Sequence, residues 1–370
     1  MIRQAVRSLI ALAVVTLLVE SVIGQQTVNL DKITYRDKKD GTNKTVEGIL
    51  KYGPIGLQIL GGDKGDKVIE TVSPGQIVRV VPNEANHPGI DRNAINAAIA
   101  MEDKKTKPEY EKARLSYDTM SKTADKKSKQ FVDFKIAQMT QRVLDETADD
   151  EGWAALAIDA GKKWGGFLID YKTGWELWPA ARSATRLSAE LGKFDEAART
   201  WTRLTKKDVE LSADLRLEAG IQEIDAQIRS RQWANAEASA KALGAAAPAG
   251  PLKDKLAIYE LAANAGANST ALAAVPLIEK KIADPTAKEP GTKDPSVRGV
   301  AFGMIGELYM SEGKTRDAMW AFLWVDTVYN ADKDEAFKAM CRLVEIFKTQ
   351  GDDDRAKFYR EKIRRARGAF

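Results

Sequence analysis

The chain has 370 residues, 44% of them apolar and 30% charged, a composition typical of folded soluble proteins rather than of disordered or membrane-embedded chains. Its 57 basic and 53 acidic side chains nearly balance, so net charge gives no reason to expect a nucleic-acid partner. One histidine, His87, and one cysteine, Cys341, cannot build a zinc cage, a thiol redox pair or an internal disulfide. We therefore expect no cofactor, no metal and no enzymatic activity.

Two catalytic alternatives remain open. A Ser-His-Asp or Cys-His mechanism would need His87 as its base, but His87 precedes Pro88 in a predicted interdomain linker, where a lone surface histidine is the commoner case. A pair of carboxylates could also act as general acid and base, because acidic residues are plentiful, although no motif supports such a site. Both alternatives rank below a binding function.

Residues 1–24 are predicted to be a secretory signal peptide. Two arginines precede a mostly apolar run at residues 9–19, and eleven residues are too few to cross a bilayer core, which needs about 20 in a helix. Cleavage after Gly24 fits best, so we expect a periplasmic or secreted protein, and the low cysteine content suits an oxidising compartment. The alternative is an uncleaved leader that anchors the chain in the membrane. The segment has no cysteine for a lipid anchor.

Residues 27–82 differ from the rest of the chain. Short β-branched runs, such as Ile77 to Val81, alternate with turns rich in Gly and Pro, and this pattern predicts about five strands. We expect a small all-β barrel or meander domain. The pattern loosely resembles SH3-like and Sm-like barrels, without a motif specific enough to carry a function across.

From Asp91 onward the apolar period changes from two toward 3.6, which predicts helix almost throughout. Residues 83–129 are interpreted as a linker followed by a polar, lysine-rich helix that is exposed or bridges the two domains.

Residues 130–177 are predicted to form divergent or capping helical hairpins. Large aromatic residues gather between Trp153 and Trp201, and we expect most of them to pack in the core, with Trp175 and Trp178 as the exposed pair. The alternative is that they line a pocket for sugars or aromatic side chains.

A recurring alanine marks residues 178–370. Four of its five copies follow a glycine-containing turn five residues upstream; the copies are Ala197, Ala236, Ala271, Ala318 and Ala356, at intervals of 39, 35, 47 and 38 residues. This spacing predicts stacked helical hairpins. Arg231 stands where the second unit would have its glycine, Pro276 should kink or end a helix of the third unit, and an insertion at residues 284–296 explains the longest interval.

The frame is clearest in the fourth unit, where Phe302, Gly306 and Tyr309 share one face of a first helix and Ala318 and Phe322 share one face of a second. This pattern resembles the tetratricopeptide repeat. The resemblance implies a mostly α fold, an α-α helical-hairpin solenoid preceded here by the small β domain. It also implies that the chain binds a protein or peptide in a concave groove lined by the first helices.

Carrying the groove positions of that family over unit by unit gives a mostly charged set: Arg182, Arg186, Asp225, Arg229, Glu260, Asn264, Glu307, Glu345 and Lys348. Positive charge gathers at one end of this set and negative charge at the other, which would orient an extended or helical partner. The alternative is that these residues form solvated helix faces with i,i+4 pairs. The Lys and Asn pattern with which some members of the family clamp a C-terminal carboxylate is not present at these positions.

The predicted function is that of an exported, non-enzymatic scaffold for protein–protein interaction, in an arrangement that resembles bacterial periplasmic repeat proteins. The alternative is a structural component of the cell envelope. It would be held to membrane or cell wall by an uncleaved leader, by the β domain or by the basic segment between Arg360 and Arg367, which carries five cations.

Overall fold

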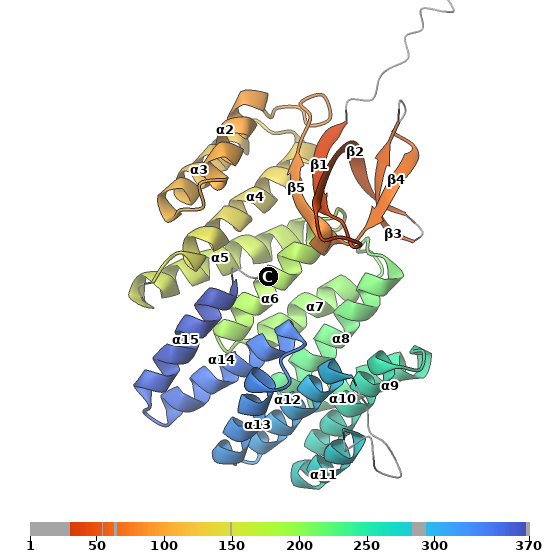
Figure 1. Cartoon of the computed structure of the whole chain (residues 1–370), viewed down its shortest axis with the longest axis vertical. Helices are drawn as coiled ribbons and strands as arrows, with labels where there is room; N and C mark the ends of the chain where they lie inside the picture. Colours follow the sequence, from red (N-terminus) through yellow and green to blue (C-terminus); the bar gives the residue numbers. More distant parts are fainter. Residues whose placement is uncertain (1–29, 54, 63–64, 149, 283–293, 368–370) are drawn as a thin grey trace, which may run out of the picture.

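The computed structural model describes residues 30–53, 55–62, 65–148, 150–282 and 294–367. Within them the chain is mostly helical, with a five-stranded antiparallel sheet followed by fourteen helices (Figure 1). The predicted signal peptide lies outside the described residues, as does most of the predicted insertion at residues 284–296. No helix in the described ranges is both long and apolar enough to span a membrane.

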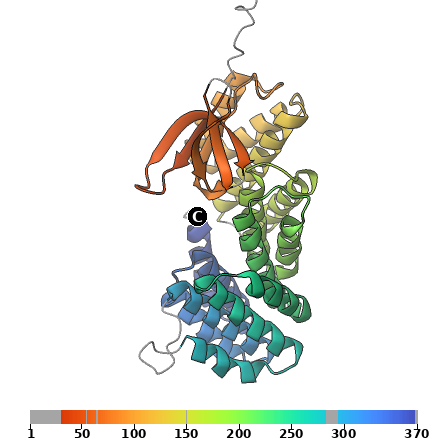
Figure 2. The same cartoon turned by 90° about the vertical axis from the view of Figure 1, so that its right-hand side faces the viewer.

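The N-terminal sheet contains the five strands that the sequence predicts. They pair in the order β4-β3-β2-β1-β5, every neighbouring pair antiparallel, and the sheet is strongly curved (Figure 2). Ile33, Tyr35, Leu57, Ile59 and Val72 fill its core, because alternate residues of a strand point to the same face. The elements are β1 (Asp31–Arg36), β2 (Asn43–Gly53), β3 (Gly56–Gly61), β4 (Lys67–Val72), the 3-10 turn η1 (Pro74–Gln76) and β5 (Ile77–Val81).

The polar helix predicted after the linker, exposed or bridging the two domains, is a pair of helices with a buried face. The segment forms α2 (Arg92–Glu102) and α3 (Lys107–Met120), which pack beside α4 (Lys126–Asp145) and strand β5; α5 (Asp150–Asp170) follows. Tyr110, Ala113, Tyr117 and Met120 are all buried, and their spacing of three and four residues makes an apolar stripe on α3. The lysines of this segment lie mainly on the opposite, exposed side.

Residues 177–367 form five hairpins in the described part of the chain, each a pair of helices joined by a short turn (Figure 1). The pairs are α6 (Leu177–Glu190) with α7 (Phe194–Thr205), α8 (Ala213–Arg229) with α9 (Trp233–Ala246), α10 (Pro251–Ala267) with α11 (Ala271–Lys281), α12 (Pro295–Ser311) with α13 (Thr315–Thr327), and α14 (Lys333–Thr349) with α15 (Asp353–Arg367).

All five hairpins turn in the same way. The second residue after the end of each first helix has a left-handed φ between 56° and 72°, a region that favours glycine. In the first hairpin Gly192 N donates to Ala189 O over 3.0 Å and Lys193 N donates to Ser188 O over 2.8 Å, the two bonds of a Schellman turn. The same pair of bonds recurs in the other four, whose left-handed residues are Arg231, Ser269, Gly313 and Gly351.

The third hairpin corrects the frame read from the sequence. Its turn residue is Ser269, whereas Gly266 lies inside α10, where a Cβ would come within 2.3 Å of the Trp233 ring. Counting five residues from the turn, as in the other hairpins, gives Ala274 rather than Ala271 as the repeating alanine. Pro276 does not end its helix, because α11 continues to Lys281.

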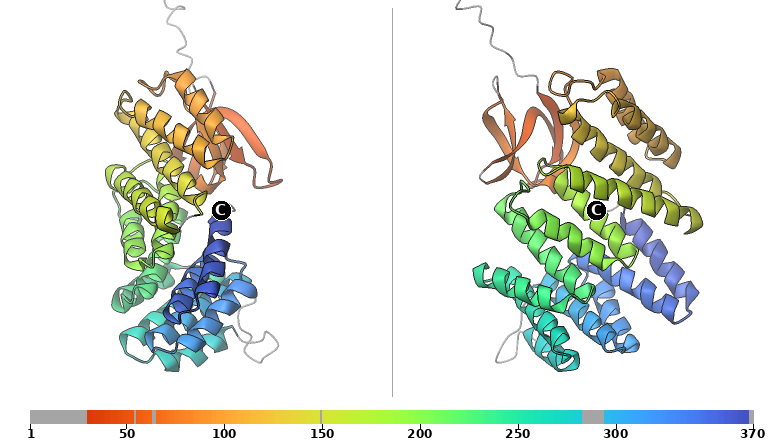
Figure 3. Two further views of the ribbon diagram at one scale, coloured as in Figure 1. Left: turned by 90° about the vertical axis from the view of Figure 1, so that its left-hand side faces the viewer. Right: turned by 180° about the vertical axis from the view of Figure 1, so that it is seen from behind.

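The last hairpin also returns to the first one. Helix α14 lies beside α6 (Figure 3), and Ala189 and Phe194 share a buried cluster with Phe337 and Met340. The helices therefore do more than contact their neighbours in chain order, and the return contact encloses charged side chains inside the molecule.

Candidate functional site

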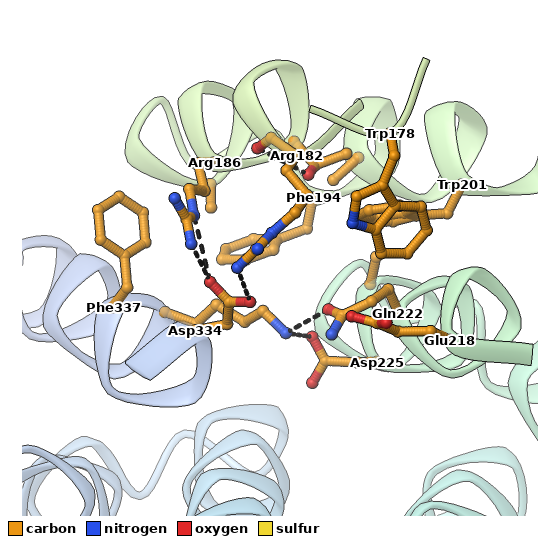
Figure 4. Close-up of a pocket in the computed structure, with 15 residues that line it drawn as sticks. Trp178, Arg182, Arg186, Phe194, Trp201, Glu218, Gln222, Asp225, Asp334 and Phe337 are labelled. Carbon is orange, nitrogen blue, oxygen red and sulfur yellow. Dashed lines mark hydrogen bonds and ion pairs between the residues drawn. The ribbon is translucent and has the colours of Figure 1, made fainter. Parts of the chain in front are cut away.

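Two of the predicted groove residues, Arg182 and Arg186 of α6, point at the same carboxylate. Arg182 Nη2 lies 2.7 Å from Asp334 Oδ2 on α14, and Arg186 Nε lies 3.2 Å from Asp334 Oδ1 (Figure 4). Burial alone would raise the pKa of Asp334, but the two guanidinium groups outweigh burial and lower the pKa to about 2. The chain itself thus supplies an acidic partner to both arginines at the basic end of the predicted groove.

Three more predicted groove residues, Asp225, Arg229 and Glu307, are buried. Arg229 Nε lies 3.0 Å from Asp225 Oδ1, and Arg229 Nη1 lies 3.0 Å from Glu307 Oε1. Lys338 and Arg342 of α14 complete the contacts, with Lys338 Nζ 2.6 Å from Asp225 Oδ2 and Arg342 Nε 2.8 Å from Glu307 Oε1. We call the following set the inner ion network: Asp225, Arg229, Glu307, Glu335, Lys338 and Arg342.

The inner ion network balances three carboxylates against three cations, as buried charges require. Glu335 accepts a bond from Arg229, while burial raises the pKa of the Glu335 carboxyl above its ordinary value. Gly303 makes room for this contact, because a Cβ there would lie 2.3 Å from Glu335 Oε1. The Arg342 guanidinium also stacks over the Phe194 ring at 4.3 Å, so the network and this ring join four helices from four hairpins.

The remaining predicted groove residues lie outside the inner ion network, although Glu345 contacts one of its members. Glu260 is half-buried, and Asn264 is exposed and donates to Glu237 Oε1 over 2.8 Å. Glu345 is exposed and lies 2.7 Å from Arg342, and the Lys348 side chain is exposed with no polar partner among the described residues. The alternative of solvated i,i+4 pairs does not describe Asp225 and Arg229 either, because their side chains are almost fully buried.

Sequence reasoning missed the α14 side of the network. Asp334, Lys338 and Arg342 follow each other at intervals of four, so they share one face of α14 and all reach inward. The available signal was a row of charged residues beside the apolar stripe of α14. The local sequence does not indicate that this row pairs with residues of α6, α8 and α12.

A larger space, which we call the central cavity, adjoins the Asp334 contact. Only about 30 Å³ is free beside Asp334, room for one water, whereas the central cavity has a volume of about 450 Å³. The two spaces share Trp178, Arg182, Arg186 and Phe337. The walls of the central cavity come from β1, η1 and β5, from α4, α5 and α6, and from α14 and the end of α15.

One aromatic residue, Trp178, is buried where the sequence predicted it to be exposed. Trp178 is buried and contacts Trp201 with ring centroids 5.4 Å apart, so the prediction of an exposed Trp175 and Trp178 pair is wrong. Trp164 is buried in the core, as expected. Trp164, Trp175 and Trp178 nevertheless each present part of their surface to the central cavity.

His87 is not a lone surface histidine. Its Nε2 lies 3.1 Å from Asp31 Oδ2, and its buried Nδ1 has no hydrogen-bond partner among the described residues. Asp31 also accepts from Asn83 N over 2.8 Å, so the pair ties the end of β5 to the start of β1. Across the described ranges, no three His, Cys, Asp or Glu side chains are grouped so as to hold a metal ion.

The basic C-terminal segment is partly used within the fold. Arg364 Nη2 lies 2.9 Å from Glu361 Oε2, and Arg367 Nε lies 2.8 Å from Glu190 Oε1 on α6. It is therefore not a continuous row of free cations.

No family model matches this chain, and comparisons with curated proteins and with solved structures also gave no match. The functional argument therefore rests on the geometry above.

Proposed function

We propose that this chain is an exported, non-enzymatic interaction protein whose tetratricopeptide-like row of helical hairpins binds a protein or peptide partner. The observation that carries the proposal is the repeated hairpin: five consecutive helix pairs with the same left-handed turn and the same two turn hydrogen bonds. Repeated hairpins expose a long surface relative to their core, and binding is the usual work of such surfaces. The β domain, in this proposal an SH3-like or Sm-like module, packs on the helices through Tyr52 and Trp175.

The accessible part of the helical surface, rather than the inner ion network, is the proposed place of recognition. The ion network satisfies its own charges, and a partner would have to break them apart. An aromatic face on α12 and α13 is open instead: Trp320 and Trp324 are about half exposed, and Phe302 stacks on Tyr329 with ring centroids 4.9 Å apart. Exposed clusters of large aromatic residues are typical of interaction hot spots.

Site-specific photo-crosslinking tests the proposal. The photoreactive residue p-benzoylphenylalanine replaces Trp324 in the full-length chain, and intact cells are irradiated. We expect a discrete adduct that contains a second protein, because the aromatic face holds a partner side chain within bond-forming range. The readout is the mass of the adduct and the identity of its second component.

The matched control places the same residue at Phe358, an aromatic position of α15 that is 60% exposed. The same adducts from both positions, or no protein adduct from position 324, would contradict a specific protein-binding face. An adduct with lipid or wall polymer instead of protein would favour the envelope-component alternative.

A further inference from the structure

The central cavity has the size and the walls of a ligand site. Its volume of about 450 Å³ falls within the range of roughly 300 to 1,000 Å³ that organic ligands occupy in proteins. Its lining residues come from the β domain, from α4 to α6 and from α14 and α15, elements that lie near one another in Figure 2, and such junctions are common ligand sites.

The wall of the central cavity has an excess of positive charge. Seven arginine and lysine side chains line it, against the two carboxylates Asp145 and Glu190. Carboxylates inside or behind the wall pair with five of these cations: Arg79, Lys135, Arg182, Arg186 and Arg367. The other two, Arg36 and Arg142, have no ion pair with any described residue.

Two unused donors point to an anionic ligand. Arg142 is half-buried on α4, and no described side chain accepts a hydrogen bond from its guanidinium. Arg367 has a side chain that is 10% exposed, and its buried Nη1 has no partner among the described residues although its Nε and Nη2 contact Glu190. A buried guanidinium donor without an acceptor costs free energy, and a bound anion would remove that cost.

The two carboxylates of the wall do not cancel this excess. Glu190 is paired with Arg367, so its charge is already compensated. Burial raises the pKa of Asp145, and the carboxyl accepts a hydrogen bond from Gln141 Nε2 at 2.9 Å. The side-chain amide of Gln138 adds a further polar group to the same wall.

The other part of the wall is apolar and aromatic. Phe134 packs edge-on against Trp175 with ring centroids 5.3 Å apart, and Trp164 and Trp178 extend the ring surface. Flat apolar bodies bind well against such rings, while the guanidinium groups fix a charged head.

We propose that the central cavity binds a small amphipathic organic anion, with its aromatic or aliphatic body on the tryptophan wall and its carboxylate, sulfonate or phosphate group on Arg142 and Arg367. This ligand is separate from the protein partner proposed above, so the two proposals stand or fall independently.

Two dyes of the same shape test the proposal on the full-length protein. The probe 1-anilinonaphthalene-8-sulfonate carries a sulfonate, and N-phenyl-1-naphthylamine has the same rings without it. We expect the wild type to bind the sulfonated dye at one site, seen as dye fluorescence and as quenching of tryptophan emission. Arg142→Gln should weaken binding of the sulfonated dye about tenfold and leave the uncharged dye within about twofold, because only the ion contact is removed.

Two further variants locate the site. Arg316→Gln removes an exposed cation of α13, remote from the central cavity, and should bind both dyes as the wild type does. Ser183→Trp fills the cavity from α6 without changing its charge and should abolish binding of both dyes. Thermal melting of each variant verifies folding, and the Ser183 variant decides the matter if Arg142→Gln does not fold. Absence of dye binding, or binding that survives Ser183→Trp, or an equal loss of both dyes in Arg142→Gln, would overturn the proposal.

Discussion

At the scale of single residues, Glu176 is buried where its ionised carboxylate is poorly solvated. It lies at the start of α6 with 6% of its surface exposed, and the hydrogen bond that its side chain accepts from a described side chain comes from Gln130 Nε2 at 3.2 Å. Burial raises the pKa of Glu176 to about 7, and the bond from Gln130 offsets only part of that effect. The Tyr52 hydroxyl, from strand β2, is also buried without a partner among the described residues.

This pKa predicts how stability depends on pH. Between the ordinary value of 4.5 and about 7, folded Glu176 binds more protons than unfolded Glu176, so the free energy of unfolding falls as pH rises through that window. The size of the effect is about 3 kcal/mol. Glu176→Gln should remove this contribution, which leaves the variant more stable than the wild type at pH 8 and similar at pH 4.5. Urea unfolding at both pH values measures the difference.

Glu111→Gln, at an exposed position of α3, is the matched control and should follow the wild-type curve. If the free energy of unfolding of Glu176→Gln and of the wild type falls equally between pH 4.5 and 8, then ionisation of Glu176 does not destabilise the folded protein.

At the scale of elements, the hairpin turns differ in how well their residue suits the left-handed backbone. Ser269 carries a side chain at φ 56°, whereas Gly192, Gly313 and Gly351 use glycine at the same place. A Cβ at Gly313 would meet nothing within 4 Å, so a substitution there tests the backbone alone.

Ser269→Gly should therefore stabilise the protein by about 0.5 to 1 kcal/mol, and Gly313→Ala should destabilise it by about 1 kcal/mol. Chemical denaturation of the two variants beside the wild type measures both values. Gly244→Ala, inside α9 where a Cβ would meet nothing within 4 Å, is the control and should stabilise, because its backbone is helical. A stable Gly313→Ala variant would show that the turn is not left-handed.

At the scale of the whole molecule, the inner ion network is predicted to matter more than surface ion pairs. Glu307 accepts from Arg229 and from two nitrogens of Arg342, over 2.8 to 3.0 Å, and it is 4% exposed. Glu307→Gln leaves these guanidinium groups buried with one negative charge fewer, and should cost about 3 to 5 kcal/mol. The midpoint and slope of urea unfolding give this value.

Asp208→Asn breaks an ion pair with Lys172 that is more than half exposed on both sides, and should cost less than about 1 kcal/mol. If the two variants lose comparable amounts of unfolding free energy, then burial does not make the ion pairs of the inner network more important for stability than exposed ones.

Local patterns in the sequence predict the local parts of this fold. The five strands and the hairpin region follow from periods of two and 3.6, and the turn at Arg231 was located although it lacks glycine. The buried face of α3 was not predicted because the segment is polar overall, although its apolar stripe contains Tyr110 and Tyr117. The third turn was misplaced because Gly266 serves a close contact with Trp233.

The candidate site was harder to predict for a different reason. Arg182, Arg186, Asp225, Arg229 and Glu307 were predicted to face a binding groove, and in the structure they pair with residues that lie far along the chain. Whether such residues meet a binding partner or each other depends on the return of α14 to α6, and no local pattern encodes that return.

The return of α14 also sets an order of events during synthesis. Arg229 finds Asp225 within its own helix, but Glu335 emerges 106 residues later, which at ribosomal rates of about 5 to 20 residues per second is a delay of roughly 5 to 20 s. Until then Arg229 and the aromatic surface at Phe194 lack the α14 residues that contact them in the folded protein. The fifth hairpin therefore completes the buried contacts of the earlier ones, and we expect chains truncated before α14 to bind chaperones instead of folding into a shorter functional protein.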